Sequence, residues 1–274
     1  MTLSRADASH QLDSAGLRAK RALGQNFVVD PNTVRRIARL SGIGEGHRVI
    51  EIGAGLGSLT LALAESGAEV TAVEIDESLL PLLRGNVGHL PNVRVVHGDA
   101  MNLDWAELLA GHDDWHLVAN LPYNVATPLV ADVLDFVPAV RHLFVMVQKE
   151  VGERFAAVPG DEAFGAVSVK VAFHGTSRVA GIVPPTVFLP RPNVDSALVQ
   201  IDRHAVPLDA TIDRERLFAL VRGGFAKRRK MLRGALAGTV TVEQFETAGI
   251  APTARAEELS VHDWLRLAHI VAAG

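Results

Sequence analysis

RVIEIGAGLGSLTL, residues 48–61, joins two apolar runs through a glycine-rich turn. Residues 48–52 have the β-branched and apolar content of a buried strand, and the residues after Gly57 have the composition of a helix. A strand that enters a helix through a glycine turn is the first unit of a nucleotide-binding α/β domain. We therefore expect an α/β fold built on a Rossmann-like sheet.

The glycine spacing selects among the ligands of such a turn. Counted from Gly53, the sixth residue is Ser58, so the dinucleotide pattern G-x-G-x-x-G is not met. The turn reads G-x-G-x-G, with Gly53 and Gly55 as its first glycines and Glu51 just before it. A carboxylate there would repel a pyrophosphate but could face the ammonium of a methionine moiety, directly or through water. The pattern favours S-adenosylmethionine over NAD as cofactor.

Two further predicted strands end in acids. Residues 69–74 end at Glu74, twenty-one residues after Gly53, where a carboxylate would hold a ribose diol. Residues 93–98 lead to Asp99, which can accept from an adenine amino group, with Ala100 and Met101 as contacts to the ring. Each acid taken alone could also be a helix cap. Strand ends at one edge of a sheet make a shared cofactor site the stronger reading.

A fourth predicted strand stops at Asn120-Leu121-Pro122-Tyr123, after the buried-strand sequence 115–119. The Asn120 side-chain oxygen and the Leu121 main-chain carbonyl, which Pro122 stiffens, could accept from an exocyclic amine, and the Tyr123 ring could stack on a base. The tetrapeptide therefore suggests methylation of the adenine amine. An ordinary loop with an Asn cap is the alternative reading.

Composition limits the class of protein. The chain has 274 residues, 48% of them hydrophobic and 21% charged, which suffices for one α/β domain and a small appendage. It has no cysteine, which excludes a thiolate metal site, and its eleven histidines are scattered along the chain, so we expect no metal site. No apolar run approaches membrane-spanning length and the first residues show no apolar signal core, so we expect a cytoplasmic protein without membrane contact.

Positive charge is concentrated in one segment. The net charge is −4, yet residues 214–233 hold eight Lys or Arg against one Glu. We expect this block to contact RNA phosphates, although a solvated helix face is the alternative. The RNA-binding residues expected are Lys20, Arg21, Arg222, Lys227, Arg228, Arg229, Lys230 and Arg233.

The remaining pattern gives the domain organisation. Residues 1–17 are expected to be a disordered tail, residues 18–206 the Rossmann-like domain, and residues 207–274 a helical RNA-binding domain. Helices are predicted at 31–40, 127–136, 213–225, 230–236, 242–248 and 261–272, and strands at 143–147 and 194–201. Residues 163–174 fit both periodicities, with a helix favoured.

Several segments together resemble the ribosomal small-subunit RNA adenine dimethyltransferases over nearly the whole chain. They are residues 23–27 (LGQNF), 51–57 (EIGAGLG), 98–100 (GDA), 120–124 (NLPYN), 194–197 (VDSA), and Phe225 with 228–233 (RRKMLR). The last two are the more specific to this family. Val28, the segment 191–193 and Gly234 depart from the usual residues of this family. The departures at 191–193 and at Gly234 bear on the strength of RNA contact.

The resemblance implies cofactor contacts at Asn26, Val28, Gly53, Glu74, Asp99 and Asn120. Gln25 and Asn26 precede a helix start and could cover a cofactor or form a packed staple. Resemblance to adenine N6-methyltransferases also places Phe188 against the target base, although a loop-anchoring hydrophobe is equally consistent with the spacing.

The implied reaction is S-adenosylmethionine-dependent dimethylation of N6 on two adjacent adenines near the 3' end of small-subunit ribosomal RNA. The expected partner is the immature small ribosomal subunit, and the enzyme is expected to be a monomer. Two alternatives stay open at this point: a large-subunit RNA adenine methyltransferase of the resistance type, and an assembly factor whose RNA binding outweighs its catalysis.

Overall fold

The computed structural model describes residues 2–227 and 230–273 and divides into two compact units. The first unit contains the chain up to residue 152 together with 178–202, and the second contains 153–177 together with 203–274. The boundary near residue 203 is close to the one expected at 206. The segment 153–177, however, groups with the C-terminal helices and not with the Rossmann-like domain.

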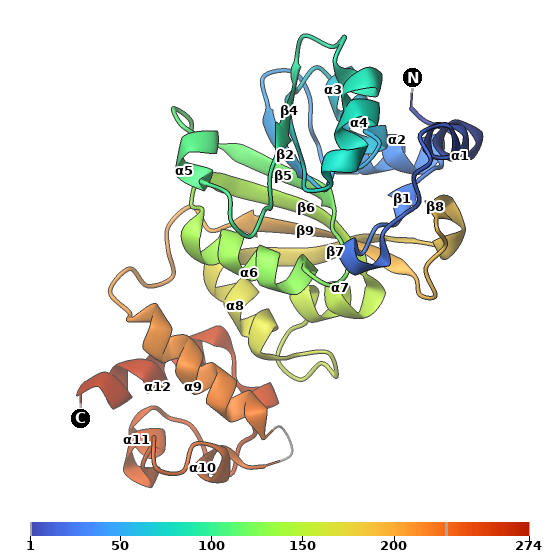
Figure 1. The fold of residues 1–274 in the computed structure, drawn as a ribbon. Coiled ribbons are helices and arrows are strands. Elements are labelled where there is room, and N and C mark those ends of the chain that lie inside the picture. The colour runs from blue at the N-terminus through green and yellow to red at the C-terminus, as the bar shows by residue number, and fades with distance from the viewer. Residues whose placement is uncertain (1, 228–229, 274) are drawn as a thin grey trace. The chain divides into compact units, whose positions relative to one another are not determined.

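A seven-stranded sheet forms the centre of the first unit, in the order β4-β3-β2-β5-β6-β9-β7 (Figure 1). Its strands are β2 (Arg48–Ile52), β3 (Glu69–Glu74), β4 (Val93–His97), β5 (Trp115–Asn120), β6 (Val140–Gln148), β7 (Gly175–Val183) and β9 (Ser196–Arg203). The strands from β4 to β6 pair in parallel, and β9 pairs antiparallel with β6. The α/β prediction is confirmed. In this topology the carboxyl ends of β2 to β5 share one edge.

The helices of this unit begin where the sequence supplies caps. Asp30 accepts a hydrogen bond from the Thr33 amide at 2.9 Å, and Pro31 occupies the first helical position. The helices are α1 (Arg5–Ser14), α2 (Pro31–Leu40), α3 (Ser58–Glu65), α4 (Leu80–Val87), α5 (Trp105–Leu108), α6 (Ala126–Phe136) and α7 (Lys149–Ala156), which runs into the second unit, with 3₁₀ turns at Arg21–Leu23, Glu77–Leu79 and Pro185–Val187.

The expected disordered tail is wrong for the described N-terminal residues, because they contain α1. Ser4 and Asp7 form a reciprocal capping box that satisfies amides at the start of this helix. Leu3, Ala8 and Leu12 are buried in a hydrophobic cluster that includes residues of α4. The short apolar run was too sparse to predict a helix, and tertiary packing supplies what local propensity lacks.

Three strands, β1 (Phe27–Val28), β7 and β8 (Phe188–Leu189), were not expected from the sequence. Strand β7 lies at the edge of the sheet, and most of its side chains are at least partly exposed, so it lacks a buried apolar run. Residues Phe27–Val28 (β1) pair antiparallel with Phe188–Leu189 (β8) as a separate two-stranded sheet. This pairing ties the segment before α2 to the proline-rich loop 184–190.

The second unit is helical, as predicted for its C-terminal part. It contains α8 (Ala166–His174), α9 (Arg214–Ala226), α10 (Leu232–Ala235), α11 (Val242–Thr247), α12 (Val261–Ala273) and a 3₁₀ turn at Ala256–Glu258. Its own hydrophobic core includes Phe164, Phe245 and Trp264, all at most 2% exposed. The helix favoured for residues 163–174 is confirmed as α8. No helix in the described part of the chain is long and apolar enough to cross a membrane.

Candidate active site

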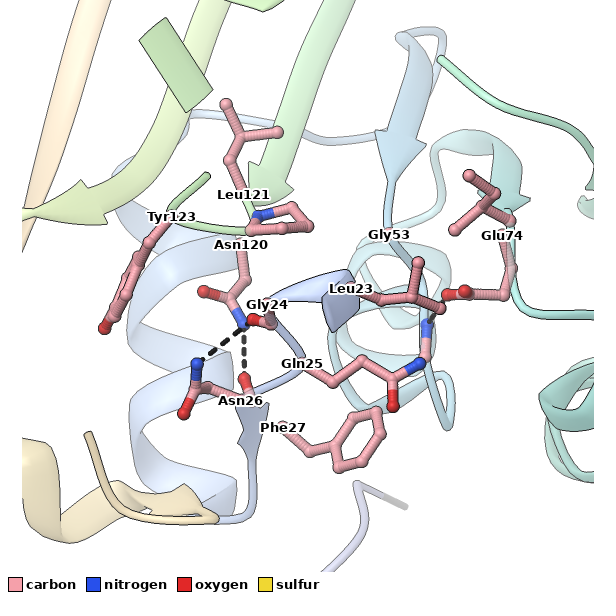
Figure 2. A pocket seen from close by; sticks show the side chains of 13 residues that line it. Leu23, Gly24, Gln25, Asn26, Phe27, Gly53, Glu74, Asn120, Leu121 and Tyr123 are labelled. Atoms are coloured by element: carbon pink, nitrogen blue, oxygen red, sulfur yellow. Dashed lines mark hydrogen bonds between the residues drawn. The ribbon is translucent and has the colours of Figure 1, made fainter. Parts of the chain in front are cut away.

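Two hollows of about 470 and 500 Å³ open at the carboxyl ends of the parallel strands. Both are lined by Leu23, Gly53, Ile75 and Pro122, so they adjoin one another. Figure 2 shows the side chains of the first hollow, which come from the N-terminal segment 23–27, the glycine turn, and the ends of β3 and β5.

The glycine turn leaves its backbone open to a ligand. Gly53 and Gly55 have φ of 74° and 59°, in the left-handed region that favours glycine. A Cβ atom at Gly55 would lie 2.9 Å from Cδ1 of Phe27, which also lines the hollow. A side chain at this position would therefore fill the space that a ligand needs.

Glu74 lines the first hollow and also braces the glycine turn (Figure 2). Its Oε2 accepts from the Gly55 amide at 2.7 Å, and its Oε1 accepts from the Asp76 amide at 2.8 Å. Burial raises the pKa of Glu74, although these backbone hydrogen bonds act in the opposite direction. Its position at a strand end beside the turn fits the expected ribose contact.

Glu51 lies outside both hollows, so the structure gives no support for the expected direct contact with a ligand ammonium. Its side chain is buried and accepts a hydrogen bond of 2.6 Å from the Thr60 hydroxyl in α3. Burial raises the pKa of Glu51 to about 8, with the nearby Glu74 adding to the shift and the Thr60 bond opposing it. Glu51 therefore joins β2 to the helix that follows the glycine turn.

Asn120 has a fixed amide orientation. Its Nδ2 donates to the main-chain carbonyl of Asn26 at 2.9 Å, and the Asn26 side chain donates to the Gly24 carbonyl at 3.1 Å (Figure 2). Within the described residues, neither Asn120 Oδ1 nor the Leu121 carbonyl accepts a hydrogen bond. Both predicted acceptors are consequently available to an amine donor.

The aromatic ring of the tetrapeptide is held by a residue that the sequence did not single out for this role. The Tyr123 hydroxyl lies 2.9 Å from the hydroxyl of Ser196, which is fully buried at the start of β9. Burial also raises the pKa of Tyr123. Leu121 is anchored by its amide, which donates to the Met146 carbonyl in β6 at 3.0 Å. Ser196 stood within one of the quoted segments, but only the sheet pairing shows its partner.

Segment 20–27, which forms one wall of the first hollow, is fastened to Asp76 after β3. Lys20 Nζ and Gln25 Nε2 donate to the two carboxylate oxygens of Asp76 at 2.7 and 2.9 Å. Burial alone would raise the pKa of Asp76, but hydrogen bonds from Lys20, Ser78 and Gln25 outweigh it and give a pKa of about 2. Lys20, expected on the RNA surface, therefore has a structural partner beside the first hollow.

The second hollow contains the acid of the third strand. Asp99 and Ala100 line it together with Met101, Val125 and Leu129. Asp99 Oδ1 accepts from the Met101 amide at 3.0 Å, which holds the carboxylate beside the hollow. This mostly apolar lining suits a flat aromatic ring.

Two expected site residues are buried away from the hollows. Val28 is 5% exposed and Phe188 is fully buried, and both belong to one hydrophobic cluster. Phe188 is packed by residues that are far away in the sequence, and its strand pairs with β1, where Val28 lies opposite it. Contact of this ring with a base would require a rearrangement of β8.

The expected RNA-binding residues outside this region lie on the surface. Arg21 is exposed in the first unit, and Arg222, Lys227, Lys230 and Arg233 are exposed in the second. Arg228 and Arg229 lie outside the described residues. The side chains of Arg222, Lys227, Lys230 and Arg233 are thus accessible to a polyanion.

Known proteins were compared with this chain. The profile of the ribosomal RNA adenine dimethylase family matches residues 16–273. Proteins named ribosomal RNA small subunit methyltransferase A are similar: the one from Cutibacterium acnes is 46% identical over 95% of this chain and 91% of its own, and that from Thermobifida fusca is 45% identical over 97% and 95%.

Two solved structures share the fold of this chain. A dimethyladenosine transferase from Plasmodium falciparum has a TM-score of 0.74 and 22% identity, covering 87% of this chain and 94% of its own. The 23S rRNA methyltransferase ErmE has a TM-score of 0.68 and 26% identity, covering 90% and 99%. The profile match over almost the whole length, with close relatives of equal extent, shows that this chain belongs to the ribosomal RNA adenine dimethylase family.

Proposed function

We propose that this protein dimethylates N6 of two adjacent adenines near the 3' end of small-subunit ribosomal RNA, with S-adenosylmethionine as methyl donor. The observation that carries the proposal is the orientation of the Asn120 amide. Its Nδ2 donates to the Asn26 carbonyl, so its Oδ1 can accept a hydrogen bond from an amine. The names of the similar bacterial proteins support the small subunit as the substrate. Immature small subunits are the proposed partner, and the cytoplasm is the proposed location.

The chemistry follows from the acceptors at the end of β5. The lone pair of the adenine N6 amine is delocalised into the ring, which makes it a poor nucleophile. Hydrogen bonds to Asn120 Oδ1 and to the Leu121 carbonyl favour a pyramidal nitrogen that carries partial positive charge in the transition state. The proton becomes acidic once nitrogen is alkylated, so positioning supplies most of the catalysis and no general base is needed.

Tyr123 fits the role of a stacking platform for the target base. The ring lines the first hollow and its hydroxyl is held by Ser196, so the direction of the long axis of the ring is fixed before the base arrives. Such fixing reduces the entropy lost on binding. Phe188, being buried, is not part of this proposed contact.

The cofactor site is proposed from residues that line the hollows. Glu74 would hold the ribose, Asp99 and Ala100 the adenine, and Gly53 and Gly55 would let the backbone approach the methionine part, with Gln25 and Asn26 covering it. Bound S-adenosylmethionine supplies an electrophilic methyl group. The open glycine backbone and the acid after each of two strands fit this group.

The helical unit is proposed to bind RNA through its exposed basic side chains. The variant Lys227→Ala/Lys230→Ala removes two of them, so the log–log salt slope of RNA binding should flatten by about 1.5–2. Cofactor affinity should not change. An unchanged slope with a lowered melting temperature would assign these lysines a structural role instead.

Incubation of undermethylated small subunits with isotope-labelled cofactor tests the reaction. Mass spectrometry of ribosomal RNA digests should find two adjacent N6,N6-dimethyladenines, and Asn120→Ala should abolish them while RNA binding persists. Label found elsewhere would refute the substrate assignment. If Asn120→Ala instead restored normal subunit maturation in a strain lacking the protein, an assembly role would outweigh catalysis.

Methylation of large-subunit RNA is the second candidate, because the similarity to ErmE covers 90% of this chain at 26% identity. Both reactions would use the same acceptors for an adenine amine. Primer extension on both ribosomal RNAs from treated particles separates them. A stop only on the large-subunit RNA would favour this candidate.

A further inference from the structure

Three histidines gather at the amino ends of neighbouring strands, at the edge of the sheet opposite to the cofactor hollows. The rings of His47 and His116 have centroids 4.8 Å apart, and those of His116 and His142 are stacked at 4.6 Å. His116 pairs with His142 across β5 and β6, and His142 pairs with Asp202 across β6 and β9. Because paired residues point to the same face, the register builds a row of His, His and Asp.

Carboxylates orient this row. His142 Nδ1 lies 2.8 Å from Asp202 Oδ1, so this ring can donate to Asp202 and present its other nitrogen as a lone pair. That nitrogen, Nε2, lies 3.9 Å from Asp114 Oδ1. A carboxylate that fixes the tautomer of a histidine ligand is the usual support of a metal-bound imidazole.

The three possible ligands converge on one point. Asp114, His116 and His142 each offer an atom, and these atoms lie within 4.8 Å of one another. A hollow of about 300 Å³ is lined by His116 and His142 together with Gln200 and Asp202. All of these residues belong to the first compact unit.

We propose that Asp114, His116 and His142 bind one divalent transition-metal ion, with Zn²⁺ as the best match, and that Asp202 positions His142. Two imidazoles and a carboxylate suit Zn²⁺ and other divalent first-row transition metals, whereas Mg²⁺ and Ca²⁺ prefer oxygen ligands alone. In a tetrahedral zinc site with nitrogen and oxygen ligands, the ligand atoms lie about 3.3 Å from one another. The ligand atoms of Asp114, His116 and His142 must therefore move closer together when the ion binds. Asp114 is 70% exposed and His142 45% exposed, which leaves both side chains room to turn inward.

The ion would join β5 to β6 and the loop before β5, far along the strands from Asn120. Its expected effect is therefore on stability and not on methyl transfer. A ligand that binds only the folded state raises the melting temperature. No metal site was expected from the sequence, because His116 and His142 lie on different strands and only the register of β5 with β6 brings them together.

The test uses the full chain without an affinity tag, stripped with a chelator and dialysed against ZnCl₂ at pH 7.5. One equivalent should bind per chain, and Co²⁺ should give the visible spectrum of a tetrahedral site. His116→Ala and His142→Ala should each weaken binding at least tenfold, and Asp202→Asn by about tenfold. His89→Ala, which removes an exposed histidine elsewhere in the same unit, should bind like the wild type.

Circular dichroism and the metal-free melting temperature show whether each variant is folded. Should either histidine variant unfold, Asp114→Asn at an exposed position provides the second test and should also weaken binding. Absence of a bound equivalent in the wild type would overturn the proposal. Equal affinity in His116→Ala, His142→Ala and His89→Ala would also overturn it, because the metal would then sit elsewhere.

Discussion

The fastening of segment 20–27 predicts a measurable effect of Lys20→Met on cofactor retention. Lys20 Nζ donates to Asp76 at 2.7 Å, and the segment that it holds supplies five residues of the first hollow, from Leu23 to Phe27. Methionine keeps the length and apolar stem of the side chain and removes only the charge and the donors. A looser wall should release the cofactor sooner.

The size of the effect follows from the exposure of the pair. Asp76 is 3% exposed, but Lys20 is 48% exposed, and Gln25 and Ser78 still donate to Asp76 after the substitution. A charge-assisted hydrogen bond contributes about 1.5–3 kcal/mol when shielded, and an exposed ion pair contributes about 0.2–1 kcal/mol. We expect about 1 kcal/mol, which corresponds to roughly fivefold weaker cofactor binding.

Stopped-flow displacement and calorimetry measure this effect, with Arg21→Met as the control that makes the same charge change at an exposed neighbour. Lys20→Met should raise the dissociation rate about fivefold, and Arg21→Met should leave it unchanged. The salt slope of RNA binding should be the same for Lys20→Met and the wild type. A normal dissociation rate together with a flatter salt slope would refute the fastening and restore Lys20 to the RNA surface.

Further predictions concern the remaining site residues. Glu74→Gln should weaken S-adenosylmethionine binding by about 1–2 kcal/mol in calorimetry, and unchanged affinity in a folded protein would remove Glu74 from the ribose site. Tyr123→Ala should lower kcat/KM by the equivalent of roughly 1–3 kcal/mol of lost base stacking. Tyr123→Phe and Ser196→Ala should each cause a smaller loss, and the double variant should lose no more than either single variant, because both remove the same hydrogen bond. Additive losses in the double variant would contradict this common hydrogen bond. Glu51 has a folded pKa of about 8, above its usual 4.5, so it stabilises the cofactor-free protein below pH 4.5 and loses this contribution as pH rises through 8. Glu51→Gln should flatten the fall in melting temperature between pH 5 and 8.5, and parallel curves would refute the raised pKa.

The convergence of the candidate site residues at one edge of the sheet could be predicted, because a single topological rule determines it. Glu74, Asp99 and Asn120 each follow an apolar run, and parallel strands bring their carboxyl ends to one edge. Local pattern was enough to find the strands, and topology then fixed where their last residues meet. The orientation of the Asn120 amide was beyond this reasoning, because its partner is a main-chain carbonyl 94 residues away.

Other errors arose where tertiary contacts outweigh local pattern. The segment before Arg18 looked too polar to fold, yet Leu12 is buried in a cluster with residues of α4. Phe188 stands in a loop framed by prolines, yet its side chain is fully buried and its strand pairs with β1. Charge predicted an RNA contact for Lys20, which stays a prediction, but it did not reveal the buried carboxylate that lies 2.7 Å away. In each example the deciding partner lies far away in the sequence.

The histidine cluster shows the same limit at the other end of the strands. Spacing rules for metal sites apply to ligands on one helix or hairpin, where a few residues separate them. In a parallel sheet the neighbours of one ligand come from other strands, and His142 and Asp202 are 60 residues apart. Their approach depends on strand order and on register, and a slip of one residue would turn His142 to the opposite face. The register that brings Asn120 level with Met146 also brings His116 level with His142, so one alignment of β5 with β6 determines both ends.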